Sequence, residues 1–172
     1  MLGKLNKEVF YPHPPERVWQ VITDSRAISA WLMENDFEPR VGCKFCFYNR
    51  SLPGIDTNIK CEVIEVSRPK RLVYTWQDCM MSQASIVSWT LKAVEGGTRL
   101  RLEHRIRETV FTGMKQPVYS QGLQSRFIPE SNFLSGYTKT NDSFILASYF
   151  NGGWEEKLCK QLPLVLIEIS GV

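Results

Sequence analysis

The chain has 172 residues with 43% apolar and 23% charged side chains, which suits one ordinary globular domain. Its formal net charge is only +3 and no Lys/Arg block appears, so we expect no nucleic-acid partner. No apolar run approaches the roughly 18 residues that cross a bilayer, and residues 1–8 lack the apolar core of a secretory signal. We therefore expect a cytoplasmic protein with no membrane partner.

The first elements are a strand and two short helices. Residues up to Tyr11 predict a strand, and the prolines of segment 12–15 force an extended turn after it. Pro15 suits the first turn of a helix, and Asp24 or Ser25 can cap the next one. The apolar faces of the two helices are Val18, Trp19, Val21 and Ile22, then Ile28, Trp31 and Leu32.

From residue 41 onward, the spacing of apolar residues changes from helical to alternating. Alternation of this kind is typical of antiparallel strands with one buried and one solvated face. The Gly96-Gly97 pair predicts a tight hairpin between the last two strands. The predicted strands are 44–48, 60–64, 72–76, 87–92 and 99–105.

The alternation fails between residues 107 and 150, a stretch that is rich in aromatic residues and too long for a plain connection. We expect an insertion or lid there. A final helix follows Gly152-Gly153. Pro163 interrupts this helix and lacks the N–H that would bond the Cys159 carbonyl, so we expect a kink or break. The apolar stripe of the helix is Trp154, Leu158, Leu162, Val165 and Ile169.

This order of elements predicts an α+β fold. The apolar stripe of the last helix needs a partner, and the inner face of the sheet is the largest one available. A strongly twisted sheet wrapped around one helix leaves space between the two. We therefore expect a single domain over residues 1–172, with a curved antiparallel sheet around a long C-terminal helix.

Five segments carry a resemblance to a known family. They are Pro14–Trp19, Glu38–Phe45, Pro69–Trp76, Gly97–His104 and Gly152–Trp154. Together they resemble the Activator of heat-shock protein 90 ATPase homologue-like domains, with Cys43 in place of a family glycine. The resemblance covers roughly residues 1–106 and 150–170. It implies the helix-grip fold of the START-like (SRPBCC) superfamily, whose members include co-chaperones, carriers and cyclases.

Aromatic residues gather on the face of the strands that we assign to the interior. Buried Tyr and Trp carry polar groups that need partners, and small-molecule sites combine apolar walls with a few polar tips. We predict a cavity for an unidentified hydrophobic or aromatic small molecule between sheet and last helix. Its predicted lining is Phe45, Phe47, Tyr74, Trp76, Val87, Trp89, Leu102, His104, Trp154 and Leu158.

Two alternatives to a binding module stay open. His104 is a weak candidate for the acid/base of a cyclase- or hydrolase-type enzyme, because a histidine titrates near neutral pH. Its other interpretation is a histidine at the end of a strand that is hydrogen-bonded to the backbone. Glu65 would face the cavity if its strand carried a bulge, whereas Glu103 faces solvent by its parity. Neither glutamate has an evident carboxylate partner.

The second alternative, a co-chaperone-like interaction with heat-shock protein 90, is implied by the resemblance. Arg99, Arg101, Arg105 and Arg107 share one strand face, which is a docking stripe or an ordinary solvated surface. The sequence leaves monomer and homodimer equally open.

The cysteines do not predict a metal site. Cys43 and Cys46 have the spacing of a zinc or redox motif, but residues three apart on a strand point to opposite faces. With no export signal, we expect the five cysteines to be reduced thiols. We expect no metal and no cofactor.

Overall fold

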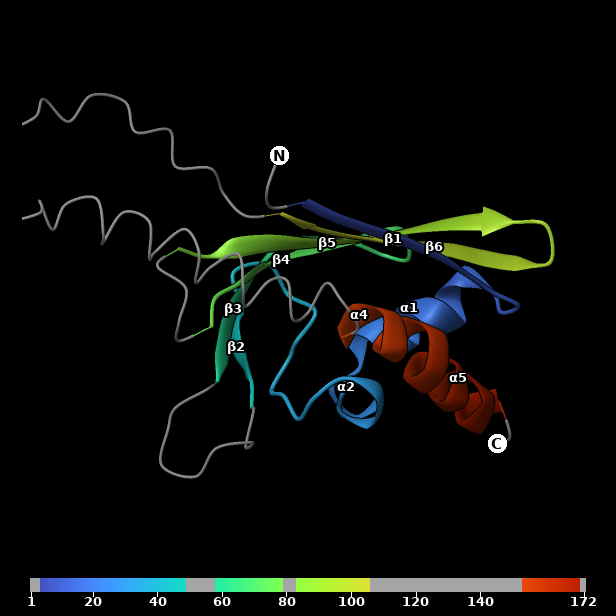
Figure 1. Ribbon diagram of the computed structural model, residues 1–172, viewed down its shortest axis with the longest axis horizontal. Coiled ribbons are helices and arrows are strands. Elements are labelled where there is room, and N and C mark those ends of the chain that lie inside the picture. The colour runs from blue at the N-terminus through green and yellow to red at the C-terminus, as the bar shows by residue number, and fades with distance from the viewer. Residues whose placement is uncertain (1–3, 49–57, 79–82, 106–152, 171–172) are drawn as a thin grey trace, which may run out of the picture.

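The computed structural model describes residues 4–48, 58–78, 83–105 and 153–170. Within them, one antiparallel sheet has the strand order β1-β6-β5-β4-β3-β2, and the helices cover one of its faces (Figure 1). The strands are β1 (Lys4–Tyr11), β2 (Lys44–Phe47), β3 (Ile59–Ser67), β4 (Arg71–Trp76), β5 (Ser85–Val94) and β6 (Gly97–Arg105). The predicted α+β helix-grip fold is confirmed. The insertion predicted at 107–150 lies outside the described residues.

Two short helices follow β1, as the sequence predicts. These are α1 (Pro15–Thr23) and α2 (Ser25–Trp31). Asp24 caps α2, because its Oδ1 accepts a hydrogen bond of 2.9 Å from the Ala27 N–H. The Trp31 indole N–H donates to the Val21 carbonyl over 3.0 Å and so ties the end of α2 to α1. The predicted apolar faces of both helices are buried.

The β5–β6 hairpin turns one residue earlier than the sequence suggests. Val94 pairs with Gly97, so the turn consists of Glu95 and Gly96, and Gly97 is the first residue of β6. Gly96 has a φ of +78°, a conformation that glycine adopts without strain. Gly97 is required for another reason: a Cβ there would overlap the carbonyl oxygen of Tyr11 on the neighbouring strand β1.

Strand β3 carries a bulge, and the bulge turns Glu65 away from the interior. The pairing of β3 with β4 shifts register between Val63 and Glu65. Ile64 and Glu65 are therefore both exposed, and Glu65 forms a 3.1 Å ion pair with Arg71. The expectation that a bulge would direct Glu65 toward the cavity is wrong, because the extra residue sends two successive side chains outward.

The last helix continues through Pro163 without a break, and the irregularity predicted near this proline takes the form of a π-helical turn. It consists of α4 (Trp154–Glu156), the π-helical turn η2 (Lys157–Gln161) and α5 (Leu162–Ser170). The Leu162 N–H bonds the Lys157 carbonyl, five residues back, and Pro163 has no N–H to offer. The Leu158 carbonyl is thus left without an intrahelical donor. The Tyr11 hydroxyl donates to it over 2.7 Å, so β1 supplies the missing hydrogen bond.

The substitution Tyr11→Phe is expected to lower the free energy of unfolding by about 1–3 kcal/mol, because the Leu158 carbonyl would stay buried without a donor. Tyr48→Phe is the matched control, since the Tyr48 hydroxyl bonds Asp36 at an exposed position. Urea unfolding followed by circular dichroism measures both variants. Equal stabilities of Tyr11→Phe and the wild type would show that this bond has no net effect.

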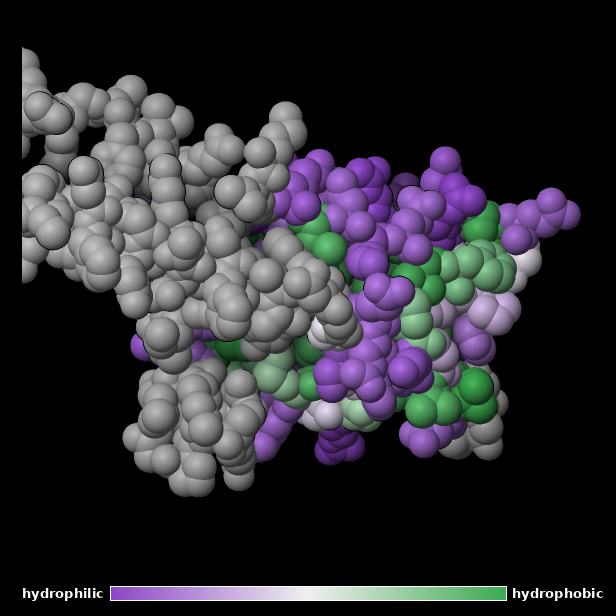
Figure 2. All heavy atoms as spheres, in the orientation of Figure 1, coloured by the Kyte–Doolittle hydropathy of each residue, from purple (hydrophilic) through white to green (hydrophobic). Residues whose placement is uncertain are grey.

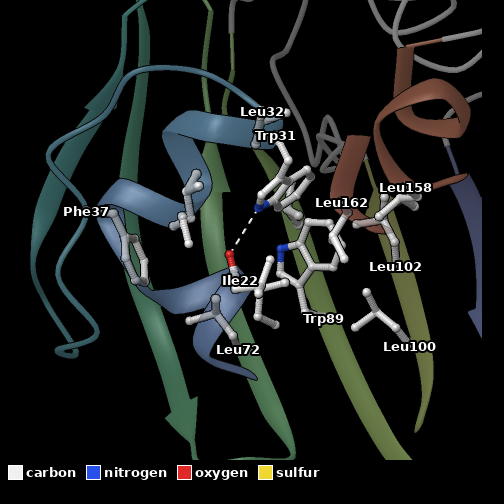
Figure 3. Packing of buried hydrophobic residues seen from close by; sticks show 14 of the residues in the cluster. Ile22, Trp31, Leu32, Phe37, Leu72, Trp89, Leu100, Leu102, Leu158 and Leu162 are labelled. Carbon is white, nitrogen blue, oxygen red and sulfur yellow. Dashed lines mark hydrogen bonds between the residues drawn. The ribbon is translucent and has the colours of Figure 1, made fainter. Parts of the chain in front are cut away.

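The interior divides into two halves of different chemistry. Beneath α1 and α5 it is aliphatic, with Val18, Val21, Leu91, Leu100, Val165 and Leu166 buried there. Toward β2, β3 and β4 it becomes aromatic. Figure 3 shows Trp89 among aliphatic side chains, with Leu72 and Ile22 on one side and Leu100 and Leu102 on the other. In the described part of the chain, none of the helices has the length and apolar run needed to cross a membrane.

Candidate functional site

The residues predicted to line a cavity all face the interior. Each of the ten is 3% exposed or less. The alternation along the strands therefore assigned the inner face of the sheet correctly, and Trp154 and Leu158 of the last helix lie opposite it. Burial alone does not distinguish a ligand site from a core, so their role in binding stays a prediction.

A chain of ring contacts runs across this part of the interior. The centroid distances are 4.9 Å for Phe37–Phe45, 5.4 Å for Phe45–Phe47, 5.3 Å for Phe47–Trp76, 5.5 Å for Trp76–Trp154 and 5.6 Å for Trp89–Trp154. Most pairs meet edge to face or tilted, the geometries that aromatic quadrupoles favour. We call the aromatic half the set Phe37, Phe45, Phe47, Tyr74, Trp76, Trp89, His104 and Trp154.

His104 lies at one end of the aromatic half, in a short polar network. The Ser85 hydroxyl donates to the Trp76 carbonyl over 2.9 Å, and its oxygen lies 2.7 Å from His104 Nε2. Since the single hydroxyl proton goes to the carbonyl, Nε2 must carry a proton and donate to Ser85. The ring packs against Trp76 at 5.7 Å and Trp154 at 6.3 Å.

This geometry gives no support to His104 as a catalytic base. Its Nε2 is the donor in the bond to Ser85, and the side chain is fully buried. Desolvation by burial lowers the pKa of His104 to about 4, so the ring is neutral at physiological pH. The structure thus agrees with a structural histidine near the end of the strand, but its hydrogen-bond partner is the Ser85 hydroxyl and not the predicted backbone group.

The buried indole groups differ in whether their N–H is used. Trp31 donates to the Val21 carbonyl, and Trp89 donates to the Tyr74 hydroxyl over 3.0 Å. The Trp154 Nε1 is buried and donates to no acceptor among the described residues. A buried donor without an acceptor is costly, which makes Trp154 the unusual member of the aromatic half.

The described residues enclose a cavity of about 10 Å³ in the aromatic half. This volume holds at most about one water molecule. Its walls include Phe47, Tyr74 and Trp89 from the predicted set. They also include residues that the sequence analysis did not assign to the site, namely Ile22, Ile28, Trp31, Leu32 and Phe37.

A second, open hollow of about 1080 Å³ lies on the outside of the domain. It runs between α1, the segment at Phe37 and the end of β3. Trp19 and Phe37 line its floor, and an ion pair of 3.1 Å between Arg68 and Glu16 lies at its rim. No pattern in the sequence indicated this groove, because its lining comes from three separate segments.

The outer face of β1, β6 and β5 is hydrophilic (Figure 2). Its basic side chains outnumber its acidic ones: Lys4, Lys92, Arg99, Arg101 and Arg105 against Glu8 and Glu103. Arg99 pairs with Glu8 at 3.3 Å and Arg101 with Glu103 at 2.7 Å. The fourth arginine of the predicted stripe, Arg107, lies outside the described residues.

The cysteines of the described segments are free thiols, and Cys46 alone of the Cys43–Cys46 pair lies within β2. Burial raises the pKa of the Cys61 thiol, which keeps it protonated. Among residues 4–48, 58–78, 83–105 and 153–170, no cluster of three histidine, cysteine or acidic side chains is placed to hold a metal ion.

The comparisons with known proteins agree with this architecture. Protein MLL2253 from Mesorhizobium loti is 28% identical over 96% of this chain and 97% of its own, with a TM-score of 0.61. Protein NE0264 from Nitrosomonas europaea is 15% identical over 99% and 97%, with a TM-score of 0.65. PFC0360w, an HSP90 activator from Plasmodium falciparum, is 22% identical over 60% and 72%, with a TM-score of 0.51. The last two show a shared fold alone.

No curated protein matches the chain. A family model described as Activator of Hsp90 ATPase homolog 1-like protein matches residues 12–127, which is more than half of the sequence. These residues include the first two helices and strands β2 to β6. The chain therefore belongs to the Activator of Hsp90 ATPase homolog 1-like family.

Proposed function

We propose that the protein binds a hydrophobic or aromatic small molecule within the aromatic half, without covalent chemistry. The observation that carries this proposal is the concentration of buried rings with polar tips between the sheet and the first turn of the last helix. Beneath α1 and α5 the interior is mainly aliphatic, so the buried rings are concentrated in one part of it. Apolar walls with a few fixed polar groups are typical of small-molecule sites.

Binding requires the rings to separate, because the enclosed cavity of about 10 Å³ is too small for a ligand. The mobile wall in this proposal is the first turn of the last helix. Its outer side is held to β1 by an exposed ion pair of 2.9 Å between Lys7 and Glu155. The π-helical turn η2 follows directly, and such turns often mark functional positions in helices. Burial of apolar ligand surface, at about 25 cal/mol per Å², drives the opening.

We expect protein purified from its own host to carry a small molecule that native mass spectrometry detects and denaturing conditions release. Phe47→Leu is expected to reduce the bound fraction severalfold, because it removes a ring from the aromatic half. Leu100→Met, in the aliphatic half, is the matched control. Leu100→Met nearly conserves volume and costs less than about 1.5 kcal/mol in stability. Phe47→Leu removes more volume, so the bound fraction of each variant is compared per folded protein.

Two results would contradict the proposal. One is wild-type protein that carries no additional mass and also fails to bind any aromatic probe added afterwards. The other is an equal loss of bound molecule in Phe47→Leu and Leu100→Met, which would attribute binding to general stability rather than to the aromatic half.

Family membership and the basic outer face favour a second candidate, interaction with an Hsp90 chaperone. The double substitution Arg101→Glu, Arg105→Glu is expected to reduce chaperone capture at least tenfold in a pull-down at low salt, because it reverses the charge of the face. Arg26→Glu on α2 is the control for a change of charge alone. Phe47→Leu changes the interior, so this variant is expected to capture the chaperone normally. Capture that is unaffected by the double substitution would reject this face as the contact surface.

A further inference from the structure

We propose that the ligand of the aromatic half is an uncharged aromatic molecule with a hydrogen-bond acceptor, such as a ketone or quinone oxygen, that receives the Trp154 indole N–H. This inference rests on the proposed function and adds the chemical class of the ligand to it. It has two supports: one unused donor inside the aromatic half, and the absence of buried cations around it.

The unused donor is well placed for such a ligand. The Trp154 ring contacts Trp76 at 5.5 Å, Trp89 at 5.6 Å and His104 at 6.3 Å, and is therefore surrounded by the other rings. Its exposed fraction is 1%, so water does not reach it. Its Nε1 nevertheless has no acceptor among the described residues. A ligand oxygen would satisfy this donor, whereas a pure hydrocarbon would leave it unsatisfied.

The surroundings favour an uncharged ligand. None of the described lysine or arginine side chains is buried. Lys7 on β1 is paired with Glu155 of α4 at 2.9 Å and is partly exposed. His104 is neutral at physiological pH because burial lowers its pKa to about 4. A carboxylate ligand would lose its hydration without meeting a cation, which is far less favourable than burial of a neutral carbonyl.

Three naphthalene derivatives of similar size test the inference: 2-acetylnaphthalene, 2-ethylnaphthalene and 2-naphthoate. All three contain the naphthalene ring. The first carries a neutral ketone acceptor, the second carries no acceptor, and the third carries a carboxylate. At pH 7 we expect the ketone to bind about tenfold more tightly than the hydrocarbon, the ratio that one buried hydrogen bond supports. The carboxylate is expected to bind at least tenfold more weakly than the ketone. Isothermal titration calorimetry or quenching of tryptophan fluorescence measures the affinities.

Trp154→Phe keeps a ring at the site but removes the donor, so the preference for the ketone over the hydrocarbon is expected to disappear. Trp19→Phe is the matched control, because Trp19 lies on α1 beside the outer groove and does not belong to the aromatic half. This variant is expected to keep the preference.

The outcomes separate the two proposals. Equal affinity of the wild type for ketone and hydrocarbon, or tighter binding of the carboxylate, overturns the inference and leaves binding in the aromatic half intact. Binding of none of the three probes overturns both. The comparison of ketone and hydrocarbon on wild-type protein remains decisive even if Trp154→Phe fails to fold.

Discussion

Trp89→Ala is expected to lower the free energy of unfolding by about 3–5 kcal/mol, the range for removal of a fully buried large aromatic side chain. Trp89 is 1% exposed and packs near Ile22, Leu72 and Leu100 (Figure 3). Its ring contacts Trp31 at 6.0 Å and Trp154 at 5.6 Å. The substitution also removes the N–H that donates to the Tyr74 hydroxyl. Chemical denaturation followed by circular dichroism gives the value.

Two variants define what this loss means. Phe10→Ala removes an aromatic side chain that is 52% exposed on β1 and is expected to change stability by less than about 0.5 kcal/mol. Trp89→Phe keeps a ring and is expected to lose less than Trp89→Ala. A loss below about 1 kcal/mol in Trp89→Ala would mean that the surrounding side chains refill the space, and that the aromatic half is more deformable than its packing suggests.

Acid is expected to destabilise the protein through His104. Burial lowers the pKa of His104 from 6.5 to about 4, so between these values the unfolded chain binds a proton that the folded protein excludes. The contribution of neutral His104 to the free energy of unfolding is fully present above pH 6.5 and falls as the pH drops toward 4. The loss amounts to about 3 kcal/mol at the lower end.

His104→Gln provides the comparison, because glutamine keeps an amide donor and does not titrate. The variant is expected to be less stable than the wild type at pH 7, and the gap is expected to narrow as the pH falls to 4. Urea unfolding at a series of pH values measures both proteins. Parallel stability curves for the two proteins would show that His104 protonates equally well in the folded state and that the interior admits water.

Local signals were enough to predict the elements that carry the fold. Alternating residues placed the strands, Asp24 is the one of the two predicted caps that caps the second helix, and the inner-face parity of the eight candidate residues on strands agrees with their burial. The structure differs from the predictions at Pro163 and Glu65 for reasons of tertiary context. At Pro163 the helix continues through a π turn, and Tyr11 on a distant strand satisfies the Leu158 carbonyl that this turn leaves without an intrahelical donor. At Glu65 the direction of the bulge was set by pairing with β4.

The site was only partly predictable from the sequence. Phe37 lies in an irregular segment, where no periodicity assigns a side chain to the interior. Trp31 was recognised as apolar but not as a wall of the cavity, since that requires knowing where α2 packs. The size of the cavity depends on how rings interlock, and the unused N–H of Trp154 depends on the position of every neighbouring acceptor. Neither property has a signature in residue order.

The pairing of β1 with β6 has a consequence for how the chain assembles. Tyr11 lies beside Thr98 in the sheet, and its hydroxyl reaches Leu158 in the last helix. Strand β1 must therefore wait for a hydrogen-bonding partner that is synthesised much later, and its contact with the last helix forms later still. Chains dominated by such distant contacts fold slowly, because loop closure precedes any gain from pairing.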